Sequence, residues 1–349
     1  MMIKREFAFA SADGKTILHV IMWVPEAVPK GIVQIAHGVS EYAGRYEDVA
    51  EVLTDAGYVV VCHDQLGHGK SINTAKDKMY FGDWEYLVSD FEAVAEVVRK
   101  EIADMPYFVM GFSMGSFVVR EYLIKHSHEV SGAIIMGTGY QPKAITKIMR
   151  MIVNAEAKKI GENNTSEFIE KLSDGVYNSN IKNPVSKRSW LLANDESLLE
   201  YMNDPNVGGA MTAGLFREML YGMEVACDKK NVRMMDRTLP VLLMSGSEDP
   251  VGNMKKGVYA VEKMFKNAGM KDIEVLFYPE SRHDILHELV REKVLHDWIT
   301  WMDKQVAKET NGAAWWWPHL GFNMIKVINK KTWEEKSFPS FLCFFIDFC

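Results

Sequence analysis

The spacing of apolar residues constrains the fold of this chain more than any other feature of its sequence. Short runs of β-branched and aromatic residues alternate with longer segments in which apolar residues recur every three or four positions. This alternation predicts an α/β protein with a mostly parallel central sheet and helices on both of its faces. The expected strands are residues 7–11, 16–24, 32–36, 58–62, 107–110, 133–136, 241–244 and 273–277. The expected helices are residues 45–56, 84–102, 116–125, 255–268 and 289–308.

Two segments depart from the alternation. Residues 7–11 and 16–24 flank Asp13-Gly14, a strong hairpin signal, so an antiparallel pair should open the sheet. Residues 140–236 are long, contain no strand-like run and are rich in methionine. We expect them to form a helical cap inserted into a core made of residues 1–139 and 237–310. The methionines would either pack between helices or give a flexible lining to a site for an apolar ligand.

Composition excludes several classes of protein. Of the 349 residues, 48% are hydrophobic and 25% charged, as in an ordinary folded globular protein. The formal charge of −7 leaves no basic surface for phosphate backbones, so we expect no nucleic-acid partner. The four cysteines form no Cys-x-x-Cys pair, which argues against a zinc ribbon, a redox dithiol or a disulfide framework. No signal-peptide or membrane-spanning pattern is visible, and we expect a cytoplasmic protein.

The last part of the sequence, residues 311–349, differs in character from the rest. It contains a run of three tryptophans, a basic stretch and the segment FPSFLCFFIDFC. A compact core should be complete at the preceding helix. This tail could dock on the core, lie at a membrane interface through its aromatic residues, or have no function. We favour the last interpretation.

A serine stands at the centre of the most informative motif. Gly111-Phe112-Ser113-Met114-Gly115 follows the expected strand 107–110 and precedes a helix expected to start at Ser116. Gly-x-Ser-x-Gly between a strand and a helix forms a nucleophile elbow, a turn so tight that the hydroxyl projects from the sheet. The alternative is a glycine-rich turn with an idle serine. We interpret Ser113 as the candidate nucleophile.

The nucleophile needs an imidazole to take its proton and a carboxylate to orient that imidazole. After such an elbow the acid and then the histidine follow in the chain, on loops behind later strands. Asp249 follows the expected strand 241–244, and His283 follows the expected strand 273–277. Glu248 is a competing carboxylate. We prefer Asp249 because it precedes Pro250, where the loop should turn back toward the site.

His283 and His287 also permit a metal-site interpretation. Their His-x-x-x-His spacing, with Asp284 second, is that of a helical zinc site. That motif needs one helix through both histidines and a third ligand, whereas His283 directly follows an expected strand. We therefore favour the role of catalytic base and expect neither a metal nor a cofactor.

The oxyanion that develops during acyl transfer needs two preorganised donors, normally backbone N–H groups. One belongs to the residue after the nucleophile, Met114. The other should come from the loop after the expected strand 32–36, and Val39 is the candidate. The alternative for this loop is a plain glycine turn. His37 should brace the loop by hydrogen bonding rather than transfer protons.

Five motifs in order carry a resemblance to a known group: HGVSEYAGRY at 37–46, DQLGHGKS at 64–71, GFSMGS at 111–116, SGSEDPV at 245–251 and SRHD at 281–284. They resemble the monoacylglycerol lipases and bacterial lysophospholipases of the α/β-hydrolase superfamily, over about residues 5–308. The resemblance implies an α/β-hydrolase fold and the triad and oxyanion roles just given. It also implies a cap over an acyl-binding cleft and a second loop that shapes the site through Asp64, Gly67, His68 and Gly69. Ser116 and the tail depart from the group's pattern.

We therefore expect a cofactor-free serine hydrolase of carboxylic esters, with monoacylglycerols or lysophospholipids as substrates. The same triad could instead act on thioesters, small esters or N-terminal peptide bonds, because one fold hosts all of these reactions. A non-catalytic binding protein with a vestigial site is a third hypothesis. The cap or the tail could touch a membrane surface transiently, which would make the protein peripheral. The sequence does not predict an oligomeric state.

Overall fold

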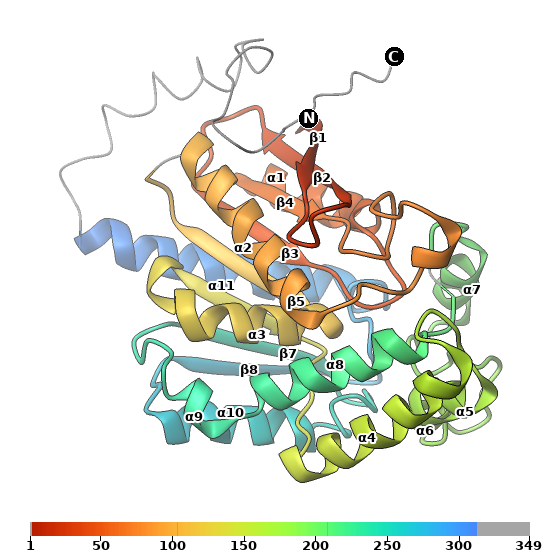
Figure 1. The fold of residues 1–349 in the computed structure, drawn as a ribbon. Helices are drawn as coiled ribbons and strands as arrows, with labels where there is room; N and C mark the ends of the chain where they lie inside the picture. The colour runs from red at the N-terminus through yellow and green to blue at the C-terminus, as the bar shows by residue number, and fades with distance from the viewer. Residues whose placement is uncertain (1, 103, 208, 313–349) are drawn as a thin grey trace.

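The computed structural model describes residues 2–102, 104–207 and 209–312. These residues form an eight-stranded sheet in the order β1-β2-β4-β3-β5-β6-β7-β8 (Figure 1). β1 pairs antiparallel with β2, and β2 pairs antiparallel with β4; all later pairs are parallel. The strands are β1 Met2–Ala10, β2 Ile17–Pro25, β3 Gly31–Ala36, β4 Tyr58–His63, β5 Tyr107–Phe112, β6 Gly132–Met136, β7 Val241–Gly246 and β8 Ile273–Tyr278.

Helices cover both faces of the sheet because neighbouring strand residues point into different cores. In β5, Phe108 packs in the core with α1 (Glu47–Asp55) and α11 (Arg291–Gly312), and Val109 packs in the core on the opposite face. That second core includes α2 (Trp84–Glu101), α3 (Met114–His126) and α10 (Lys256–Ala268). Buried parallel strands with apolar residues on both faces require this double cover. Short 3₁₀ turns occupy Ala43–Tyr46, Ala75–Asp77 and Ser127–Glu129.

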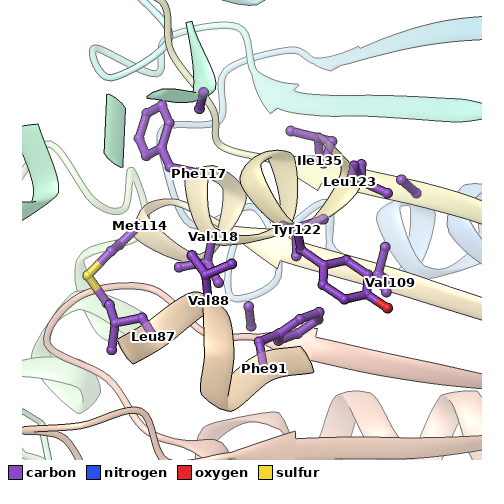
Figure 2. Packing of buried hydrophobic residues seen from close by; sticks show 14 of the residues in the cluster. Leu87, Val88, Phe91, Val109, Met114, Phe117, Val118, Tyr122, Leu123 and Ile135 are labelled. Atoms are coloured by element: carbon purple, nitrogen blue, oxygen red, sulfur yellow. The ribbon is translucent and has the colours of Figure 1, made fainter. Parts of the chain in front are cut away.

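The helix that follows the serine is firmly held between its neighbours. Figure 2 shows Val88 and Phe91 of α2 against Val118 and Tyr122 of α3, with Val109 of the sheet beside them. The rings of Phe91 and Tyr122 meet edge to face, with centroids 5.2 Å apart. Dense packing of this kind fixes the N-terminus of α3, and with it the turn at Ser113, relative to the sheet.

The described part of the segment between β6 and β7 forms helices and loops. α4 and α8 lie side by side (Figure 1). Met219 and Met223 of α8 pack into the core beside α2 and α3, whereas Met151 and Met202 are exposed. The elements are α4 Lys143–Ile160, α5 Glu167–Glu170, a π-helical turn Lys171–Gly175, α6 Val176–Asn178, α7 Asp195–Asn203, α8 Ala213–Ala226 and α9 Lys229–Val232.

The predicted strands, opening hairpin and covering helices are present, but several boundaries were wrong. β1 starts at Met2 rather than at residue 7, because pairing with β2 from Met2↔Pro25 onward outweighs the low strand propensity of its charged residues. The predicted helix 45–56 is a 3₁₀ turn followed by α1. α3 begins at Met114, not Ser116, and α11 begins at Arg291, not residue 289. Residues 313–349, which hold almost all of the predicted tail, lie outside the described residues. In the part that is described, no helix is both long and apolar enough to cross a membrane.

Candidate active site

The turn between β5 and α3 places Ser113 in a conformation that few residues adopt. Its φ is 52° and its ψ −117°, outside the regions favoured by residues with a side chain. Gly115 makes the turn possible, because a Cβ there would lie 2.0 Å from the carbonyl oxygen of Ala36. The start of α3 therefore lies directly against the end of β3. The serine, which is 9% exposed, stands where β3 and β5 both end.

Three side chains from separate strand ends form one hydrogen-bonded chain. The Oγ of Ser113 lies 2.8 Å from the Nε2 of His283, and the Nδ1 of His283 lies 3.0 Å from the Oδ1 of Asp249. A carboxylate only accepts, so Nδ1 carries the ring proton and Nε2 is free to accept from the serine hydroxyl. All three residues are buried. The structure thus brings together the three residues that sequence analysis singled out, in an arrangement able to activate a serine.

Asp249 is held in place by hydrogen bonds from two directions, whereas its neighbour Glu248 faces solvent. The backbone N–H of Val251 donates to Asp249 Oδ1 at 2.8 Å, and the Ser245 hydroxyl donates to Oδ2 at 3.2 Å. The side chain of Glu248 is exposed to solvent. Of these two adjacent carboxylates, that of Asp249 accepts the hydrogen bond from His283.

The loop after β3 lies beside the serine. A Cβ on Gly38 would come within 3.2 Å of the Cβ of Ser113. The Gly38 N–H donates to the buried carboxylate of Glu41. Among the described residues no acceptor takes the N–H of Val39 or of Met114. In the described structure, one N–H without an acceptor thus belongs to the loop beside Ser113 and the other to the residue after the serine, which are the two places where the sequence predicts oxyanion donors.

His37 braces this loop, as expected from the sequence. The Gln65 N–H donates to His37 Nε2 at 2.9 Å, so the proton of the ring sits on Nδ1, which donates to the Gly38 carbonyl at 2.7 Å. Burial, with a contribution from neighbouring His68, lowers the pKa of His37 to about 3. Asp64 holds the next loop by accepting from the N–H groups of Ala43 and Lys70.

The zinc-site geometry is not formed. Residues 281–290 form turns rather than a helix, so His283 and His287 do not share a helical face. Both ring nitrogens of His283 already face Ser113 and Asp249. His287 instead places Nδ1 2.9 Å from the Asp284 carboxylate.

Comparison with known proteins identifies the family. The model of the family described as serine aminopeptidase, S33, matches residues 27–290, which is more than half of the chain. The chain belongs to this family. The matched residues include the loops after β3 and β4, the turn at Ser113, and the loops after β7 and β8 that carry Asp249 and His283.

Known proteins and solved structures resemble the chain over most of its length. The monoacylglycerol lipase of Mycolicibacterium smegmatis is 26% identical over 86% of this chain and 97% of its own. The monoglyceride lipase of Mus musculus is 26% identical over 87% and 92%. Among solved structures, a carboxyl esterase from Bacillus coagulans has a TM-score of 0.81 at 24% identity, covering 88% of this chain and 100% of that one. A soluble variant of the Saccharomyces cerevisiae monoglyceride lipase has a TM-score of 0.65 at 20% identity, with coverage of 83% and 92%. These findings confirm the predicted α/β-hydrolase fold and the predicted class, a carboxylic ester hydrolase.

One buried charge cluster of this hydrolase was missed by sequence reasoning. The guanidinium of Arg45 lies 2.8 Å from Asp284 and 3.5 Å from Glu41, so it joins the loop after β3 to the loop that carries His283. Burial raises the pKa of Glu41. Burial also acts to raise the pKa of Asp284. The nearby His287 and Arg45 outweigh this effect of burial and hold the pKa of Asp284 well below its usual range. All three residues lie within the recognised motifs, but nothing in the sequence shows that they pair.

Proposed function

We propose that this hydrolase cleaves esters that carry a single long acyl chain, with monoacylglycerols as the first substrate class to test. The observation that carries the proposal is the hydrogen-bonded chain from Ser113 through His283 to Asp249. It lies at the strand ends where this fold places acyl-transfer chemistry. Two relatives that align with nearly their whole length are named as lipases of this substrate.

The proposed mechanism follows from the geometry. His283 takes the proton of Ser113 as the hydroxyl oxygen attacks the ester carbonyl, and Asp249 holds the imidazole and stabilises its cation. The N–H groups of Val39 and Met114 stabilise the oxyanion. The imidazolium then protonates the departing alcohol. Water activated by His283 releases the acyl group from the serine.

The buried acids near the site favour esters over N-terminal peptides. An aminopeptidase needs an acidic group to bind the substrate's ammonium. Glu41 and Asp284, two buried carboxylates in the loops around the site, are both paired with Arg45. Lysophospholipids remain the second ester class, because they share the single acyl chain.

We propose that residues 140–236 form the cap that shelters the acyl chain, and that this cap touches lipid surfaces. One face of α4 exposes a continuous apolar stripe, and the same helix carries basic residues suited to anionic headgroups. The stripe consists of Ile145, Ile148, Met151 and Ile152, which are 50%, 58%, 73% and 42% exposed. The cytoplasmic location of the protein remains a prediction from the sequence.

The decisive experiment compares Ser113→Ala with Ser116→Ala, a control at the next serine of the chain. We expect the intact protein to be labelled by a fluorophosphonate and to hydrolyse monoolein faster than lysophosphatidylcholine or an aminoacyl amide. Ser113→Ala should lose labelling and turnover, and Ser116→Ala should keep both. Preference for the aminoacyl amide would overturn the substrate proposal, and turnover by Ser113→Ala would overturn the mechanism.

A further inference from the structure

Residues 186–194, between α6 and α7, lie across the loop that carries His283. They form turns rather than a helix or a strand, and residues 189–192 are nonetheless buried. A buried loop must satisfy its backbone groups through specific partners. In this segment those partners belong to the loop of the proposed catalytic base.

Backbone groups of the 186–194 segment are tied to both neighbours of His283. The Asp284 N–H donates to the Leu191 carbonyl at 2.9 Å. The Arg282 guanidinium donates to the carbonyls of Ser189 and Leu192, at 2.7 and 2.9 Å. Further along, the Glu288 carboxylate accepts from the Ala193 N–H at 2.6 Å.

Trp190, in the middle of the segment, packs directly on the imidazole. The ring centroids of Trp190 and His283 are 5.1 Å apart, and Trp190 is 5% exposed. Tyr177 supports Trp190 at 5.0 Å, and Phe112 contacts the imidazole at 5.0 Å. The bonds to Ser113 and Asp249 lie along the imidazole and fix its two nitrogens. These two hydrogen bonds do little to prevent the ring from rotating about the line through Ser113 Oγ and Asp249 Oδ1. Aromatic side chains packed against the ring restrict that rotation.

We propose that the 186–194 segment positions His283 for proton transfer to the leaving alcohol, with Trp190 as the positioning residue. This inference rests on the proposed function. The imidazolium must shift its donor bond from the serine oxygen to the oxygen of the departing alcohol, and a loosely held ring would miss that second oxygen more often. The inserted segment is then a part of the catalytic architecture as well as a cover for the acyl chain.

The test uses two esters of the same acyl group with different leaving groups. p-Nitrophenolate departs without a proton, whereas a glyceryl alkoxide must receive one from His283, a transfer worth roughly 10²–10⁴-fold. We expect Trp190→Ala to lower kcat/KM for the glyceryl ester by roughly tenfold or more beyond its effect on the p-nitrophenyl ester. Trp190→Phe, which keeps a flat ring, should recover most of the difference. Because kcat/KM reports the steps through acylation, slow deacylation does not mask the effect.

Controls separate positioning from folding. Val185→Ala, at a 68% exposed site beside the segment, should leave both rates unchanged. Arg282→Met removes the hydrogen bonds to Ser189 and Leu192 and should lower kcat/KM for the glyceryl ester relative to the p-nitrophenyl ester, as Trp190→Ala does. It replaces Trp190→Ala in the test if the Trp190→Ala variant does not fold. Equal losses on both esters, as from a smaller folded fraction, would overturn the positioning role. If the intact protein hydrolysed neither ester, the proposed function itself would fail, and this inference with it.

Discussion

At the scale of single residues, two adjacent carboxylates have opposite environments. Asp249 is fully buried and bonded to His283, and its neighbour Glu248 faces solvent. Asp249→Asn should lower kcat by roughly 10⁴-fold, because the amide can donate to Nδ1 and favour the wrong tautomer. Glu248→Gln should leave kcat unchanged. Steady-state hydrolysis of a soluble ester measures both, and a larger loss in Glu248→Gln would show that the orienting acid is misassigned.

The sequence places some residues of the site better than others for a physical reason. Ser113 directly follows β5, and Asp249 and His283 lie on the loops after β7 and β8. Because parallel strands bring their carboxyl ends to one edge, local pattern suffices to place them. Trp190 reaches His283 from a segment of turns whose course depends on tertiary contacts. Arg45 lies in the motif at 37–46, but its pairing with Asp284 links parts of the chain that are far apart in sequence.

At the scale of elements, the junction of β3, β5 and α3 leaves no room for a side chain. A Cβ on Gly115 would lie 2.0 Å from Ala36 O and 2.7 Å from His37 O, both backbone atoms. Gly115→Ala should therefore destabilise the fold by several kcal/mol and displace Ser113. The control is Gly175→Ala, because a Cβ there would lie no closer than 3.4 Å to any neighbour. Urea unfolding measures the difference, and equal stability of the two variants would contradict this account of the elbow.

The exposed stripe of α4 gives a second prediction at this scale. Replacing Ile148 and Met151 with serine should weaken binding to anionic lipid vesicles and slow hydrolysis of vesicle-borne substrate, because less apolar surface enters the interface. Turnover of a dissolved short-chain ester should not change. The matched control replaces Leu199 of α7, which is 62% exposed, with serine. Co-sedimentation with vesicles measures binding, and undiminished sedimentation of the α4 variant would refute the membrane role of the stripe.

Element boundaries show where local pattern stops being sufficient. The helix after the elbow was expected from Ser116, yet α3 begins at Met114 because Ser113 itself serves as the residue before the helix. β1 extends to Met2 through charged residues that only the pairing with β2 makes extended. The course of residues 140–236 was predicted only as helical, since its contacts with the loops around the site are set by the assembled core.

At the scale of the whole molecule, three buried histidines should make the fold sensitive to acid. Burial is the main cause that lowers the pKa of His37 to about 3, and of His63 and His68 to about 4 each. The unfolded chain takes up these protons near pH 6.5, so it binds more protons than the folded protein between that pH and about 4. The free energy of unfolding therefore falls as the pH is lowered through this window.

His63 offers the sharpest test of this linkage, because neither of its ring nitrogens has a partner among the described residues. Its pKa falls from 6.5 to about 4 on folding, which corresponds to about 3 kcal/mol of stability lost across the window. His63→Phe keeps a ring that can pack against Phe91. Between pH 6.5 and 4, its free energy of unfolding should fall by about 3 kcal/mol less than that of the parent protein. His128→Gln, at a side chain that is 69% exposed, should follow the parent curve. Urea unfolding at each pH measures these curves, and a His63→Phe curve parallel to that of the parent would mean that this histidine does not stay neutral in the folded protein.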